Sequence, residues 1–289
     1  MMTCRTCLFD MKITNKYNLP EPYVRAATPD GRHNDGMIHV TSLTSPPQLQ
    51  RLQRAHWDEL EEDVTDRLYM LDGSARHFVL QHAGGGEGDL VEYNVKSDIG
   101  GHTVTGTVDY MTADGRLYDY KNTSVWSVLD MKKTMRPEYA AQLNYYAALL
   151  RINDFTVNEA HIVASSRDWR RSEARRSEDY PNKVEVIRVP LWSPEVAMEA
   201  LADAVIEHVA ETPRPCTDDE RWRKADKYAV MKVGRKSALR VLDSMDEAQA
   251  WMCANGGNSI EQRPGGYVRC EDYCPVSRFC KQFSGENEE

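Results

Sequence analysis

The stretch "GTVDYMTADGRLYDYKNTS", residues 106–124, places charged side chains inside two runs that read as β-strands. Between them, Ala113-Asp114-Gly115 suits a three-residue hairpin loop, a type I turn closed by a glycine in the left-handed conformation. This loop would pair Asp109 directly with Asp119, and Lys121 would share their face because side chains alternate along a strand. A two-residue Asp-Gly turn would instead put the two carboxylates on opposite faces. We predict the longer loop.

Two carboxylates that face each other repel unless one is protonated or a cation lies between them. A divalent metal ion with oxygen ligands would meet this need and leave coordination positions for water and a phosphate. Lys121 beside the ion could hold or activate the water and stabilise charge developing on phosphorus. For so short a motif, an exposed Asp–Lys cross-strand pair is the competing interpretation.

Length and composition favour a soluble protein with a substantial core. The chain has 289 residues, of which 41% are hydrophobic, and a formal net charge of -9. No apolar run approaches the ~20 residues that span a bilayer, and no signal peptide opens the chain, so we expect a cytoplasmic protein with no membrane partner. The negative charge argues against a protein that simply coats nucleic acid, but a local basic groove is compatible with it.

The chain divides into three parts by composition. Residues 1–40 are rich in turn formers and read as an N-terminal arm. Residues 41–212 alternate between helical and strand-like patterns and are predicted to form the core. Residues 213–289 hold most of the cysteines around a small ββαβ insertion at about 227–263.

Within the core, the hydrophobic spacing predicts a helix over 46–72 that Gly73 ends, and a second helix over 74–83 that carries His77. Strands are predicted within 91–121 and a long amphipathic helix over 136–152. Further strands and a helix follow before residue 213. The fold class is therefore α/β, with a mixed central β-sheet flanked by helices.

Cysteine placement predicts a metal site near the C-terminus. Cys270, Cys274 and Cys280 lie within eleven residues, and a fourth ligand must come from elsewhere. Cys216 is the best candidate, with Cys4 or Cys7 as the runner-up. Four cysteines hold either an iron–sulfur cluster or structural zinc. Either group would have a structural role, and free thiols are the remaining alternative.

The hairpin resembles the active site of the PD-(D/E)XK nucleases, the restriction-endonuclease-like fold in which an acidic residue precedes a [D/E]-x-K on adjoining strands. Here Asp109 stands first and Asp119-Tyr120-Lys121 follows. "GSARH", residues 73–77, resembles the helical G-x-x-x-H motif of the RecB-like branch, and "QLNYY", residues 142–146, its Q-h-x-x-Y motif. The cysteine cluster is similar to the iron–sulfur version of that branch, so the resemblance implies a structural [4Fe-4S] cluster held by Cys216, Cys270, Cys274 and Cys280 rather than zinc. The cluster of this chain differs from the family pattern in two ways. Three residues separate Cys270 from Cys274, and no cysteine lies just before the core helix.

The resemblance assigns a role to each of these residues. It implies that Asp109 and Asp119 bind Mg2+ or Mn2+, with His77 and the Tyr120 backbone carbonyl as further ligands. Lys121 would orient or activate the attacking water. Gln142 and Tyr146 would contact the substrate backbone or brace the lysine, whereas neighbouring Tyr139 and Tyr145 are expected to pack.

These expectations describe a metal-dependent DNA nuclease that hydrolyses phosphodiester bonds, with an exonuclease acting on DNA ends or single strands favoured over a sequence-specific enzyme. Trp169 among the arginines of "RDWRR" suits a single-strand channel. The compact chain is similar to bacteriophage recombination nucleases, which would imply a helicase or annealing protein as partner. The alternatives are a catalytically weak DNA-binding accessory protein on the same fold, and a phosphoesterase acting on small nucleotides.

Overall fold

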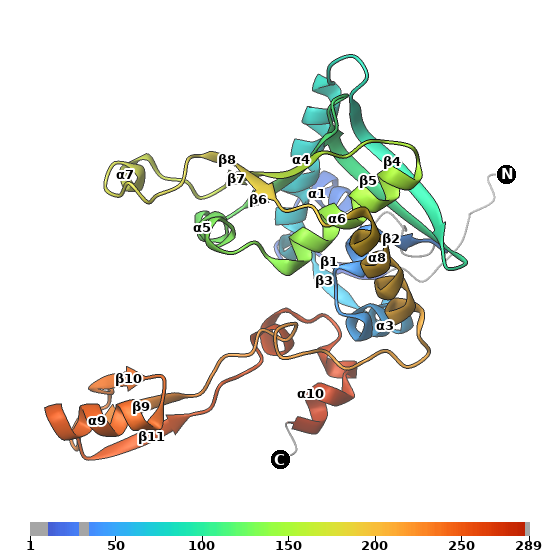
Figure 1. The fold of residues 1–289 in the computed structure, drawn as a ribbon. Coiled ribbons are helices and arrows are strands. Elements are labelled where there is room, and N and C mark those ends of the chain that lie inside the picture. The colour runs from blue at the N-terminus through green and yellow to red at the C-terminus, as the bar shows by residue number, and fades with distance from the viewer. Residues whose placement is uncertain (1–10, 29–34, 287–289) are drawn as a thin grey trace. The chain divides into compact units, whose positions relative to one another are not determined.

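A computed structural model of the chain describes residues 11–28 and 35–286 (Figure 1). The chain forms two compact units, residues 1–213 and residues 214–289. The first unit contains a mixed six-stranded sheet and the helices that pack on it, and the second contains a small antiparallel sheet and the cysteines. None of the described helices has the length and apolar character needed to cross a membrane.

The central sheet has the strand order β2-β5-β6-β7-β8, and β4 pairs with β5. Neighbours β4–β5, β5–β6 and β7–β8 are antiparallel, whereas β2–β5 and β6–β7 are parallel. The observed mixed sheet agrees with the predicted α/β class. The strands are β2 (Ile38–His39), β4 (Leu90–Ile99), β5 (His102–Met111), β6 (Arg116–Thr123), β7 (Glu159–Ser166) and β8 (Val184–Val189).

The sheet and its helices enclose one apolar core. Leu117 and Ile162 on the strands pack with Leu143 and Leu149 of α6, and all four are almost completely buried. Helix α6 contacts β4 and β6, α8 packs against α6, and α4 contacts β6. The helices of this unit are α1 (Glu21–Ala27), α2 (Val40–Leu43), α3 (Pro47–Ala55), α4 (Leu68–Ala83), α5 (Val125–Lys133), α6 (Pro137–Ile152), α7 (Arg171–Ala174) and α8 (Pro194–Val209).

Helix α6 forms as predicted, with Pro137 at its first position, where a missing N–H costs no hydrogen bond. Every residue from Gln142 to Leu150 is buried, so the helix passes through the core rather than lying on its surface. This position carries the polar side chains of its middle turns into the interior, where they need partners.

The predicted helix over 46–72 is wrong. Helix α3 ends at Ala55, short 3₁₀ turns and strand β3 (Glu61–Asp63) follow, and α4 then runs through Gly73 without a break. Asp63 explains the interruption. Its carboxylate accepts hydrogen bonds from the Thr65 amide, the Thr14 hydroxyl and the Lys16 amide. These bonds stabilise a helix cap at Asp63 rather than a helix that continues through it. A glycine inside a helix costs only about 1 kcal/mol relative to alanine, so Gly73 is tolerated.

The N-terminal region is more ordered than the arm we expected. Strand β1 (Lys12–Thr14) pairs in parallel with β3, and α1 buries Ala27 completely. Apolar burial and strand pairing outweigh the local preference of the turn-forming residues. Cys4 and Cys7 lie outside the described residues.

In the second unit, β9 (Lys227–Met231) lies between β10 (Arg240–Leu242) and β11 (Ser259–Arg263), with antiparallel pairing on both sides. Helix α9 (Met245–Asn255) contacts all three strands, so the elements follow one another along the chain as β-β-α-β. A π-helical turn at Arg269–Tyr273, a 3₁₀ turn at Ser277–Phe279 and α10 (Lys281–Glu286) complete the unit.

Candidate active site

The β5–β6 hairpin has the predicted three-residue loop. Tyr110 pairs with Tyr118, and Met111 pairs with Leu117. Continuing the same register places Asp109 opposite Asp119. Gly115 closes the loop with φ 86°, in the left-handed region. Its amide donates to the Thr112 carbonyl at 2.9 Å, and the Thr112 amide donates to the Arg116 carbonyl at 3.0 Å. The register that brings the two carboxylates to one face is therefore fixed by local turn chemistry.

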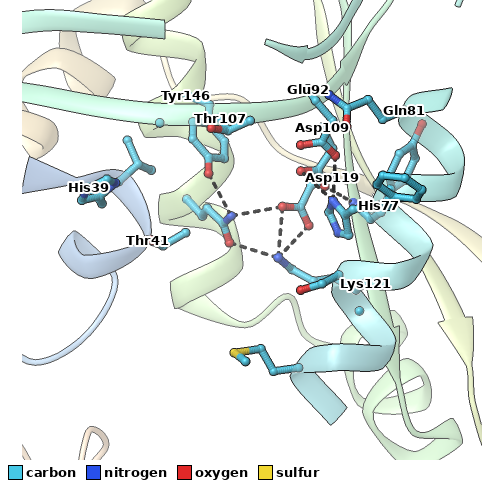
Figure 2. Close-up of a pocket in the computed structure, with 18 of the residues that line it drawn as sticks. His39, Thr41, His77, Gln81, Glu92, Thr107, Asp109, Asp119, Lys121 and Tyr146 are labelled. Atoms are coloured by element: carbon cyan, nitrogen blue, oxygen red, sulfur yellow. Dashed lines mark hydrogen bonds and ion pairs between the residues drawn. The ribbon is translucent and has the colours of Figure 1, made fainter. Parts of the chain in front are cut away.

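A pocket of about 560 Å³ opens beside this hairpin, between α4, α6 and strands β4 to β6 (Figure 2). It brings together side chains from segments that are far apart in the sequence. All seven residues predicted for the nuclease site line it: His77, Asp109, Asp119, Tyr120, Lys121, Gln142 and Tyr146.

Lys121 is held by two partners at the floor of the pocket. Its Nζ donates to Asp119 Oδ1 at 3.0 Å and to Gln142 Oε1 at 3.2 Å, and it lies 2.9 Å from Asp119 Oδ2. Burial alone would lower the pKa of Lys121, but the Asp119 carboxylate outweighs it and the pKa is raised. The lysine is therefore a charged hydrogen-bond donor at neutral pH rather than a free base.

Gln142 ties the lysine to the core. Its Nε2 donates to Asp119 Oδ1 at 3.1 Å and lies 3.4 Å from the Tyr146 hydroxyl, while its Oε1 faces Lys121. Gln142 therefore contacts the lysine in this structure, which is compatible with one of the two roles foreseen for it. Tyr146 is 4% exposed, and burial raises its pKa well above the usual range.

Asp109 lies where β5 and β6 separate. Its Oδ2 accepts a hydrogen bond from the Tyr120 amide at 2.6 Å, replacing a bond that the strand ladder would otherwise supply. Burial, and then the charge of Asp119, raises the pKa of Asp109 from 3.8 to about 7. The positive charge near Asp109 and Asp119 is therefore too small to keep both carboxylates fully ionised at neutral pH.

His77 reaches the same carboxylate from α4. Its Nδ1 lies 2.9 Å from Glu92 Oε1 and 3.5 Å from Asp109 Oδ1. Burial opposes the charged imidazole, but the two carboxylates prevail and raise the pKa of His77. The histidine is thus placed on the side of Asp109 that faces β4.

One residue of the site was missed by our reading of the sequence. Glu92 of β4 lines the pocket, and extending the β4–β5 register would have placed it opposite Asp109. Tyr139 packs against the core as expected, and its ring centre also lies 5.2 Å from Lys121 Nζ, in a cation–π contact. Tyr145 does pack as expected, being 7% exposed and set edge-on against Trp192.

Trp169 does not form the exposed stacking surface that its arginine neighbours suggested. Its indole N–H donates to the Pro181 carbonyl at 2.9 Å, and the ring is half-buried beside Tyr180. Arg167 instead stacks 4.1 Å from the ring centre of Tyr69, at the start of α4.

The second unit brings Cys216 close to the other three predicted cluster ligands. Burial raises its pKa to about 11, with further contributions from Glu220 and then from Cys280, Cys270 and Cys274. Within the described chain, no three cysteine sulfurs all lie within 4.8 Å of one another.

No protein-family model matches the sequence, and no curated protein matches it closely. Among solved structures, the protein SSO0001 is similar with a TM-score of 0.41 and 16% identity, over 65% of this chain and 82% of the other. An alkaline exonuclease from Laribacter hongkongensis, LHK-Exo, matches with a TM-score of 0.35 and 15% identity, over 65% of this chain and 94% of its own. LHK-Exo in complex with dAMP matches with a TM-score of 0.34 and 16% identity, over 61% and 89%.

Proposed function

We propose that this protein is a divalent-metal-dependent DNA nuclease of the PD-(D/E)XK type that hydrolyses phosphodiester bonds. One observation carries the proposal: a charged lysine is fixed between Asp119 and Gln142 in an open pocket, beside a second carboxylate, Asp109, that faces the first. A hydrolase acting on a phosphodiester needs this combination of oxygen ligands for a cation and a fixed positive charge near the phosphate.

The donor set fits Mg2+ or Mn2+. Asp119 is buried and the Asp109 side chain is 12% exposed. Asp119 Oδ2 accepts no hydrogen bond from any described residue, although it forms an ion pair with Lys121 Nζ at 2.9 Å. With the Tyr120 carbonyl and His77, the two carboxylates would supply the oxygen-rich ligand set that such cations accept. A cation bound there lowers the pKa of a coordinated water and neutralises charge on the phosphate.

The protein side chains have separate tasks in this proposal. Lys121 donates hydrogen bonds to the attacking water or to a phosphate oxygen and offsets the charge that develops there. Gln142 keeps the ammonium group aimed into the pocket, and Tyr146 supports Gln142 from the core. Since Lys121 is protonated, it acts as an electrostatic and orienting group rather than as the base.

The substrate we propose is DNA, bound at ends or as a single strand. The surface around the pocket offers stacking groups: Tyr69 is 64% exposed and pairs with Arg167, and Trp126 is 79% exposed at the start of α5. Asp168 accepts a hydrogen bond from the Val125 amide at 2.7 Å and so links the segments that carry Arg167 and Trp126. Aromatic rings beside cations bind single strands without regard to sequence. A helicase or annealing partner stays a prediction.

The test is degradation of DNA labelled at either the 5′ or the 3′ end, with Mg2+, Mn2+ or EDTA. We expect wild-type protein to degrade the DNA with metal and to lose this activity in EDTA and in Asp119→Asn. Asp203→Asn, an exposed carboxylate on α8, is the matched control and should retain activity. Metal-independent DNA binding by wild type without degradation would favour the accessory-protein alternative. The label that disappears first would give the polarity.

For Cys216, Cys270, Cys274 and Cys280 we propose a structural [4Fe-4S] cluster, with zinc as the alternative. The support for this proposal is that the sequence supplies four cysteines in one unit and that the charges of Cys270, Cys274 and Cys280 contribute to the raised pKa of Cys216. Iron and sulfide analysis of protein purified without oxygen would test this. Stoichiometric zinc, or no metal in fully folded protein, would contradict it.

A further inference from the structure

Glu92 is the carboxylate in the pocket for which the hairpin motif has no place. It lies on β4, outside the D-x-K hairpin, and its side chain is 17% exposed. Strand pairing continues on both sides of it, Val91 with Tyr110 and Tyr93 with Val108, so its position opposite Asp109 follows from the register. The three carboxylates Glu92, Asp109 and Asp119 therefore lie in a row across three adjacent strands.

The side chain of Glu92 converges with two others. Figure 2 shows the Glu92 and Asp109 carboxylates and the His77 ring pointing toward one another. One ligand atom from each of these residues lies within 4.8 Å of the other two. The closest approach of His77 to both carboxylates is through the same atom, Nδ1. A single small species could therefore be shared by all three side chains.

The two carboxylate oxygens of Asp109 contact different elements of the pocket. Oδ2 is engaged by the Tyr120 amide of β6, and Oδ1 faces His77 and, beyond it, Glu92. Asp119, by contrast, is engaged by Lys121 and Gln142. Asp109 therefore presents Oδ1, which lies 3.5 Å from His77 Nδ1, on the side away from the Tyr120 amide.

Glu92 also departs from regular strand conformation. Its φ is 46°, a left-handed value that is uncommon for residues other than glycine, asparagine and aspartate. Such conformations persist where the surrounding structure imposes them, and they concentrate at functional sites. The distortion is confined to Glu92, because its neighbours remain paired with β5.

We propose that Glu92 is a direct ligand of the divalent cation, through Oε1, together with Asp109 Oδ1 and His77 Nδ1. The inference rests on the proposed function, since it extends the ligand set of that site. Imidazole nitrogen and carboxylate oxygen together suit Mn2+ among the two cations considered, because nitrogen ligands are poorly suited to Mg2+.

The test measures Mn2+ binding directly, by electron paramagnetic resonance and calorimetry, in wild type and in Glu92→Gln. We expect the substitution to weaken Mn2+ affinity about tenfold or more, the range found when support of a metal ligand is lost. Water-proton relaxation should show about one additional water on the bound ion. Glu87→Gln, an exposed carboxylate just before β4, is the matched control and should change neither value.

Further variants separate failure of this inference from failure of the proposed function. Nitrogen coupling to Mn2+ should persist in Glu92→Gln and disappear in His77→Ala, which shows that the same site is occupied. If Asp109→Asn loses Mn2+ while Glu92→Gln binds it like wild type, Glu92 is not a ligand and the proposed site stands. If wild type and Asp109→Asn bind Mn2+ equally, both proposals fail. Glu92→Asp, which keeps the charge, should bind Mn2+ with intermediate affinity and serves if Glu92→Gln does not fold.

Discussion

Replacing Lys121 by methionine should destabilise the metal-free protein strongly, because it leaves the Asp119 carboxylate buried without its counter-charge. Asp119 is 4% exposed, and its oxygens lie 2.9 and 3.0 Å from Lys121 Nζ. At this separation the attraction is about 6 kcal/mol for an effective dielectric constant of 20. Loss of hydration offsets part of this, and removing one partner of a buried pair typically costs about 3–5 kcal/mol. We expect Lys121→Met to fall in that range.

A double-mutant cycle separates the ion pair from other effects of the substitution. Asp119→Asn removes the charge while keeping the shape, and the double variant removes both charges. The double variant should be more stable than Lys121→Met alone, since no buried charge is then left unpaired. We expect an interaction energy of about 2–3 kcal/mol between the two positions.

The assay is urea unfolding in EDTA. Unfolding is monitored by hydrogen exchange in peptides from β5 and β6, so that the signal reports on the unit that contains the site. Lys133→Met, an exposed lysine on α5, is the control and should change the free energy of unfolding by no more than about 0.5 kcal/mol. A cost below about 1 kcal/mol for Lys121→Met, with additive effects in the cycle, would refute the reasoning. The pair would then be solvated rather than buried.

Three further predictions concern the hairpin and the pocket floor. Gly106→Ala places a Cβ 2.4 Å from the Tyr146 ring and should cost about 1–3 kcal/mol in thermal unfolding; an unchanged midpoint would contradict the close packing. Gly115→Ala imposes φ 86° on an alanine and places its Cβ 2.5 Å from the Thr156 carbonyl oxygen, so a loss of at least about 1–2 kcal/mol is expected by the same measurement. The pKa of Asp109 is raised from 3.8 to about 7 in the folded protein, so its effect on stability is absent below pH 3.8, becomes increasingly unfavourable between pH 3.8 and about 7, and is constant above that. In EDTA, lowering the pH from 8 to 6 should therefore raise the free energy of unfolding by about 1.4 kcal/mol in total relative to Asp109→Asn, and equal slopes in both proteins would exclude this cause.

Much of the hairpin could be predicted because its determinants are local. The identity of three loop residues selects the turn, the turn sets the register, and strand alternation then decides that Asp109, Asp119 and Lys121 share a face. The structure confirms this chain of inference for the register. The helix over 46–72 was mispredicted for the opposite reason, since the contacts of Asp63 with a strand about fifty residues earlier interrupt a pattern that looks helical in isolation.

The hairpin strands, the turn and the residue types of the candidate site follow from the amino-acid sequence alone, because hydrophobic periodicity and turn chemistry act over a few residues. Which side chains meet depends on tertiary packing. Gln142 reaches Lys121 because α6 passes through the core, and Glu92 reaches His77 because β4 pairs with β5 beside α4. These contacts depend on how whole elements pack, which the burial of apolar surface decides collectively and no short motif encodes.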